Sequence, residues 1–115
     1  MSKSTRDLLE DLRQELQDIE NFTTGGEAEF MSDIRTQKAV IRSYEVVGEI
    51  TKRLPPSLLE VNSQVEWRKL VSFRNFLAHN YDLIVLRYLW EAVEQLPTLR
   101  AAAEAMLASL PPDET

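Results

Sequence analysis

The chain has 115 residues, no cysteine and a formal net charge of −6, with 43% hydrophobic and 28% charged residues. This length fits one domain spanning residues 1–115, and the lack of cysteine excludes disulfides, thiol chemistry and cysteine metal sites. No apolar run approaches the roughly 20 residues of a membrane span, and the charged N-terminus is unlike a signal peptide. We therefore expect a cytoplasmic protein that does not enter a membrane.

The first half of the chain predicts two helices. The first covers residues 4–22, where Ser4 and Asp7 give a capping signal and four apolar residues share one face: Leu9, Leu12, Leu16 and Ile19. The run TTGGE at 23–27 predicts a loop. The second helix is predicted from Glu29 to Leu54, with two apolar stripes: Val40, Tyr44, Val47 and Leu54, and then Ile34, Ile41 and Gly48. Glycine costs about 1 kcal/mol in a helix interior, so Gly48 predicts close approach by another helix.

Pro55-Pro56 ends this second helix, and the segment up to residue 66 is predicted to be a connector with at most one helical turn. A third helix is expected from Trp67 to about Ala78, where Asn80 interrupts it. Asp82 is placed to cap a fourth helix that ends near Gln95. Pro97 fits the first turn of a fifth helix ending near Leu110, unless this segment continues the fourth after a kink. The expected fold is all-α, a four- to five-helix up-and-down bundle.

The charge is unevenly distributed along the chain. Residues 1–31 hold 3 basic and 8 acidic side chains, residues 32–81 hold 8 and 5, and residues 82–115 hold 2 and 6. The middle third is thus the stretch that could attract phosphate, while the acidic ends are typical of solvated helix faces.

The chain has one histidine, His79, and it lies in the run RNFLAHNY. Arg74 lies five residues before it and Tyr81 two residues after it. Asn75 is four residues before His79, so on a helix its side-chain amide is expected to orient the imidazole and select its tautomer. A lone histidine is more often structural than catalytic, and spacing alone leaves a structural arginine and a packed tyrosine as the more frequent reading of such a short motif.

The chemistry of this set fits RNA cleavage by the substrate's own 2′-hydroxyl. Histidine transfers protons near neutral pH, a guanidinium binds phosphate through paired hydrogen bonds, and a phenol adds a donor. The sequence offers no metal-ligand cluster, so no cofactor and no metal is expected. Since one imidazole cannot act as base and acid at once, we expect a homodimer or a higher even oligomer in which two His79 face a shared cleft.

The pattern of Arg74-Asn75, His79 and Tyr81 resembles the R-x4-H-x-Y signature of the HepT-like toxin family in the HEPN superfamily. The resemblance extends to TQKAVIRSYEVVGEITKRLP (36–55), VEWRKLVSFRNFLAHNYD (65–82) and LRYLWEAVEQLPTLRA (86–101). It implies a HEPN-like bundle acting as a metal-independent endoribonuclease with Arg74, His79 and Tyr81 as catalytic residues. It also implies a partner, an MNT-type nucleotidyltransferase antitoxin, which silences the toxin by AMPylation of Tyr81.

Two supporting residues complete the predicted site. Asn75 is the polar residue that the family favours after the arginine, and Glu49 is expected to point toward Arg74 or His79, although an ion-pair ladder with Arg42, Glu45 and Lys52 is the plainer interpretation. Four basic residues could widen a phosphate-binding rim: Lys52, Arg53, Arg68 and Lys69. No aromatic cluster interleaved with basic residues is visible along the sequence. The alternative function is a non-catalytic HEPN module that only docks a nucleotidyltransferase.

Overall fold

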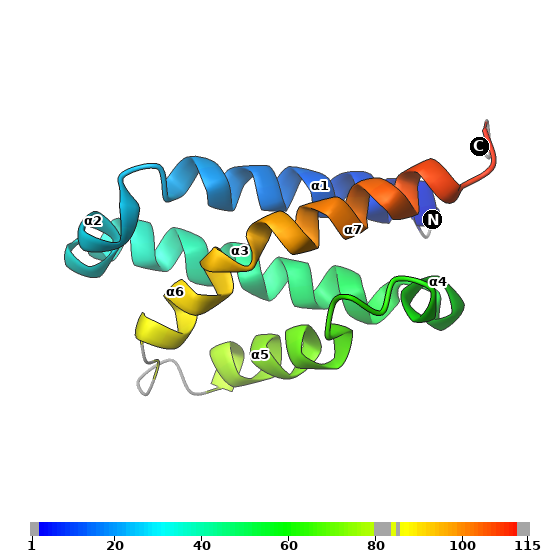
Figure 1. Cartoon of the computed structure of the whole chain (residues 1–115). Coiled ribbons are helices and arrows are strands. Elements are labelled where there is room, and N and C mark those ends of the chain that lie inside the picture. The colour runs from blue at the N-terminus through cyan, green and yellow to red at the C-terminus, as the bar shows by residue number, and fades with distance from the viewer. Residues whose placement is uncertain (1–2, 80–83, 85, 113–115) are drawn as a thin grey trace.

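A computed structural model describes residues 3–79, 84 and 86–112. This part of the chain forms seven helices: α1 (Thr5–Phe22), α2 (Gly26–Ser32), α3 (Ile34–Arg53), α4 (Pro56–Glu60), α5 (Trp67–His79), α6 (Leu86–Glu94) and α7 (Leu96–Ser109). Figure 1 shows α1, α3, α5 and the α6–α7 pair running alternately in opposite directions. The predicted all-α up-and-down bundle is confirmed, with α2 and α4 as short additions between the long helices.

The first helix begins where the sequence predicted. The Ser4 side chain accepts a hydrogen bond from the Asp7 backbone N–H at 3.0 Å, and the Asp7 carboxylate accepts one from the Ser4 N–H at 3.3 Å. This reciprocal capping box satisfies two N–H groups that the helix leaves unpaired. The apolar stripe of α1 is completely buried and faces α3 and α7: Leu9, Leu12, Leu16 and Ile19.

The prediction of one continuous helix from Glu29 to Leu54 is wrong, because the helix is interrupted at Asp33. Helix α2 already begins at Gly26, within the predicted loop, and ends at Ser32. The Asp33 carboxylate then accepts hydrogen bonds from the Arg35 N–H at 3.0 Å and the Thr36 hydroxyl at 2.9 Å, which starts α3. These bonds hold the pKa of Asp33 below its ordinary value. Ile34 is consequently 63% exposed rather than part of a packed stripe.

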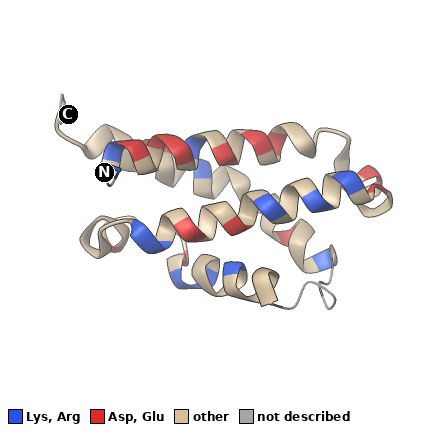
Figure 2. Cartoon of the chain, turned by 180° about the vertical axis from the view of Figure 1, so that it is seen from behind, with Lys and Arg blue, Asp and Glu red and all other residues tan. Residues whose placement is uncertain are grey.

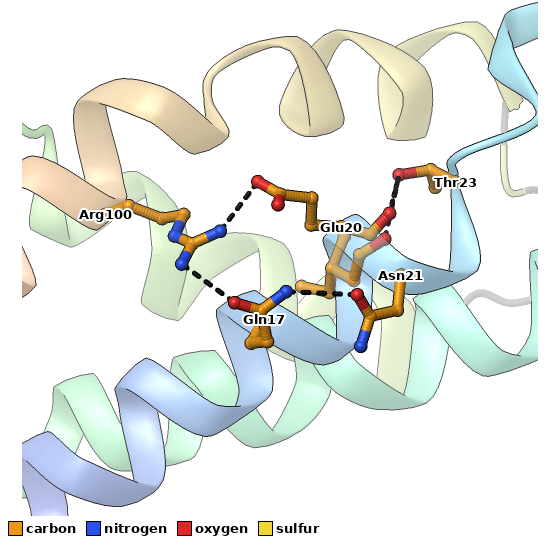
Figure 3. Close-up of polar contacts among 6 residues, drawn as sticks. Gln17, Glu20, Asn21, Thr23 and Arg100 are labelled. Atoms are coloured by element: carbon orange, nitrogen blue, oxygen red, sulfur yellow. Dashed lines mark hydrogen bonds and ion pairs between the residues drawn. The ribbon is translucent and has the colours of Figure 1, made fainter.

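The closing helix is tied to the first one by polar contacts. The Arg100 guanidinium donates to the Glu20 carboxylate at 2.6 Å and to the Gln17 side-chain oxygen at 2.9 Å (Figure 3). Arg13 on α1 likewise donates to Glu104 on α7 at 3.0 Å. With Leu99, Ala102, Ala103 and Met106 buried beneath them, these pairs hold α7 on α1. Helix α5, which carries Arg74 and His79, instead packs on α3 and lies apart from the α1–α7 contact.

Candidate active site

The approach of α5 to α3 is set by Gly48. A Cβ atom built on Gly48 would overlap the Arg74 Cβ and lie 2.9 Å from the Leu70 carbonyl oxygen. The two helix backbones are therefore closer at this point than any side chain on residue 48 would permit. The close helix approach predicted from Gly48 is confirmed, and the side chain that packs against Gly48 is that of Arg74.

Glu49, the residue after this glycine, forms an ion pair with Arg74. The Glu49 carboxylate lies 3.2 Å from one terminal nitrogen (Nη2) of Arg74, and the Asn75 side-chain oxygen accepts a hydrogen bond from the other (Nη1) at 3.0 Å. Both carboxylate and guanidinium are partly exposed, so the pair contributes little to stability. Its effect is to orient a guanidinium whose remaining N–H groups stay available to a phosphate. The predicted contact between Glu49 and Arg74 is confirmed.

His79 is exposed at the last residue of α5, and its ring is oriented by the backbone. Its Nδ1 atom lies 2.9 Å from the Asn75 carbonyl oxygen. A carbonyl oxygen only accepts hydrogen bonds, so Nδ1 carries a proton and the neutral ring presents Nε2 as the proton acceptor. The prediction that the Asn75 amide orients the imidazole is wrong, because the amide oxygen is bound to Arg74.

This geometry predicts that Asn75→Ala leaves the His79 tautomer unchanged. The substitution retains the backbone carbonyl and removes only the amide that binds Arg74. The ¹⁵N chemical shifts of the imidazole, measured at a pH where the ring is neutral, should report protonated Nδ1 in both the wild type and the variant. A change to protonated Nε2 in the variant would show that the side chain selects the tautomer.

Arg74 and His79 do not contact each other within the part of the chain that the structure describes. Five residues on an α-helix turn the side-chain direction by about 140°, so the two residues leave α5 on different sides. Arg74 points toward α3, while His79 lies beyond the face that packs there. The structure thus brings together Glu49, Arg74 and Asn75, and joins His79 to them through the Asn75 backbone. Tyr81, Asn80 and the predicted cap Asp82 lie outside the described residues.

Arg74 also lies at the edge of a polar groove between α1 and α3, with a volume of about 600 Å³. Arg42 and Arg53 line it together with the acidic residues Glu15, Glu45 and Glu49. Burial raises the pKa of Glu15, and a hydrogen bond with Ser43 partly opposes this. Figure 2 shows acidic positions along α1, mixed charges along the neighbouring α3 and basic positions on α5. Of the predicted rim residues, Arg53 reaches this groove, and Lys69 pairs with Glu66 at 2.8 Å. Arg42, which the sequence placed on the same helix face as Glu49, lines it too.

Two further observations concern the described residues only. No helix among them is both long and apolar enough to span a membrane. Across the same ranges, no three His, Asp or Glu side chains gather in a way that could hold a metal ion.

Residues 12–106 match the family model described as "Ribonuclease HepT-like". The chain belongs to the HepT-like ribonuclease family. It is 35% identical over 108 residues to "Probable ribonuclease HepT" of Thermococcus cleftensis, an alignment that covers 92% of this chain and 98% of the relative. A protein of Methanocaldococcus jannaschii named as a candidate RNase is 39% identical over 92 residues, covering 79% and 76% of the two chains.

Another relative named as a candidate RNase, from Caldanaerobacter subterraneus, is 31% identical over 107 residues, or 91% of this HepT-like chain and 96% of its own. No solved structure matches the chain. Family and fold together support an RNase of the HEPN type.

Proposed function

We propose that this HepT-like chain is a metal-independent endoribonuclease, the toxin of a HEPN–MNT toxin–antitoxin pair, with Arg74, His79 and Tyr81 as catalytic residues. The observation that carries the proposal is the tautomer and the exposure of the His79 ring. Its exposed ring is held through Nδ1, which leaves Nε2 as the proton acceptor, on the same helix as an arginine oriented by Glu49. An exposed imidazole held in one tautomer is suited to general acid–base catalysis, and Arg74 on the same helix supplies a group that can bind phosphate.

The reaction balances without a co-reactant. A neutral His79 Nε2 takes the proton of a ribose 2′-hydroxyl, and the freed oxygen attacks the adjacent phosphorus. The bond from phosphorus to the 5′-oxygen of the next nucleotide breaks, and that oxygen gains a proton from an imidazolium. The products are a 2′,3′-cyclic phosphate and a 5′-hydroxyl, while Arg74 stabilises the charge that develops on the phosphate oxygens.

Two copies of the chain would divide the proton transfers. One imidazole starts neutral as the base, and the other starts protonated as the acid, so a homodimer or higher even assembly with two His79 facing one cleft completes the site. Light scattering on the purified protein at micromolar concentration should give a mass of at least two chains. An active monomer would overturn this arrangement.

The mechanism predicts that cleavage of purified tRNA and mRNA persists in EDTA and leaves cyclic phosphate ends. The reason is that each chemical role is filled by a side chain: proton transfer by His79 and charge stabilisation by Arg74. A terminal phosphate that a phosphatase removes only after acid has opened the ring would identify these ends. Activity that disappears with chelator and returns with a divalent ion would contradict the mechanism.

Silencing is proposed to occur by AMPylation of Tyr81 by a cognate MNT-type nucleotidyltransferase. Because Tyr81 follows His79 by two residues in the sequence, AMP on it would add a negative charge that can pair with Arg74 and repel RNA. Tyr81→Phe removes the acceptor oxygen, so this variant should resist labelling by the partner with ATP. Undiminished labelling mapped by mass spectrometry to another residue would place the switch elsewhere.

A further inference from the structure

A second groove lies between α5 and the α6–α7 pair, with a volume of about 660 Å³. We call it the aromatic groove, because four aromatic side chains from three helices line it: Tyr44, Phe73, Phe76 and Tyr88. These residues are scattered over 45 positions of the sequence, from 44 to 88, and so form no visible motif. The fold therefore creates an aromatic cluster that the sequence did not reveal.

The groove contains a buried polar group without a partner. Tyr44 is 2% exposed, and its hydroxyl has no hydrogen-bond partner among the described residues. Its ring meets Phe73 edge-on, with ring centroids 5.7 Å apart. Burial raises the pKa of the Tyr44 phenol, so the group is a neutral hydroxyl able both to donate and to accept. Leaving such a group unpaired costs stability, so a ligand that paired with this hydroxyl would gain a hydrogen bond.

One residue that lines the groove lies close to His79 on the same helix. Phe76 lies three residues before His79 on α5, so the two side chains are neighbours on the helix surface. Tyr88 on α6 is 63% exposed although it is a large aromatic residue. Polar side chains that could reach a ligand's edges also line the groove: Gln64, Lys69, Gln95 and Thr98.

We propose that the aromatic groove binds one base of single-stranded RNA next to the scissile phosphate, stacked on its rings and hydrogen-bonded to Tyr44. The proposal rests on the ribonuclease function above. A nucleobase matches the groove because it is flat and apolar on its faces but carries donors and acceptors on its edge. An aliphatic side chain of another protein would fill the same space and leave the Tyr44 hydroxyl unpaired. The volume is in the range of small-ligand sites, roughly 300–1,000 Å³.

The first test compares single-stranded RNA oligonucleotides containing one cleavage site with copies in which a neighbouring nucleotide is abasic. The abasic ribose keeps the 2′-hydroxyl and the phosphate and removes only the base. For the wild type, we expect kcat/KM to fall about tenfold or more when the base on one side of the site is removed. Tyr88→Ala should show a similar loss with intact RNA and little further loss with abasic RNA. Ile34→Ala is the matched control, since Ile34 is also 63% exposed and lines neither groove.

The second test uses Tyr44→Phe, which keeps the ring and removes the unpaired hydroxyl. This variant should unfold at the same or a higher temperature than the wild type. We expect the wild type to discriminate several-fold among oligonucleotides that differ only in the base next to the cleavage site, and the variant to lose that preference. Full discrimination by Tyr44→Phe would overturn the role of the hydroxyl.

Equal cleavage of intact and abasic RNA, or equal behaviour of Tyr88→Ala and Ile34→Ala, would overturn the base site while leaving the ribonuclease intact. Tyr88→Ala could instead change the mass of the assembly, measured by light scattering without RNA, and leave the ratio of kcat/KM for intact and abasic RNA unchanged. The groove would then be a protein interface, and the proposal would fail. If the wild type cut no RNA, the ribonuclease proposal itself would fail. Fluorescence anisotropy with intact and abasic oligonucleotides would then still test the groove by binding.

Discussion

Gly48→Ala is expected to lower the free energy of unfolding by about 1–3 kcal/mol, the usual cost of overpacking a close helix contact. Two effects oppose each other here. Alanine favours the helix by about 1 kcal/mol over glycine. Against this, the new methyl group would meet the Leu70 carbonyl and the root of the Arg74 side chain, neither of which can rotate away. We expect the clash to dominate and α3 and α5 to move apart, which would also separate Glu49 from Arg74 and reduce RNA cleavage.

Gly25→Ala is the matched control for this substitution. Gly25 has an ordinary φ of −75°, and the atoms nearest to a Cβ there belong to the carboxylate end of Glu29, an exposed side chain that can swing aside. Denaturant unfolding should show no loss of stability for Gly25→Ala and a clear loss for Gly48→Ala. If both variants were as stable as the wild type, the close packing of α5 on Gly48 would be contradicted.

Arg74→Ala is expected to lower kcat/KM for RNA cleavage by about 10²–10³-fold, the typical cost of removing a group that stabilises charge in the transition state. Arg74→Lys should recover only part of this activity, because an ammonium lacks the planar fork that binds phosphate and the Glu49 carboxylate together. Thermal unfolding of both variants should stay near the wild type, since the ion pair is partly exposed.

Arg68→Ala provides the control on the same helix. Arg68 is exposed near the start of α5 and lines neither groove, so its loss should change cleavage only slightly. Equal effects of Arg68→Ala and Arg74→Ala would mean that α5 acts through its overall positive charge. Unaltered cleavage by Arg74→Ala would remove the arginine from the mechanism.

Much of the fold follows from local signals in the sequence. Pro55-Pro56 ends α3 as predicted, and the Ser4–Asp7 capping box starts α1. The break at Asp33 was missed because apolar residues continue at helical spacing across it, and a capping aspartate followed by Thr36 is a weaker signal than the hydrophobic pattern. The exposure of Ile34 follows from the same break, since α3 begins there at the end of the bundle.

The sequence predicts a contact of the candidate site where the type of a single residue determines that contact. Gly48 implied a close helix, and Glu49 on the next position then reached Arg74. The contact of His79 was not predictable, because sequence spacing places the Asn75 side chain and its carbonyl equally near the ring, and only the geometry decides between them. The aromatic groove was invisible for another reason. Its rings come from α3, α5 and α6, and tertiary packing alone brings them together.

The most direct test of the ribonuclease proposal is the digestion of tRNA and mRNA by purified wild type and His79→Ala in the same buffer containing EDTA. General acid–base catalysis contributes about 10²–10⁴-fold, so the wild type should cut RNA and the variant should be slower by at least the lower figure. Because His79 is exposed at the end of α5, the variant should retain the wild-type helical content and unfolding temperature. A folded His79→Ala protein that cuts RNA as fast as the wild type would show that His79 is not the proton-transfer group.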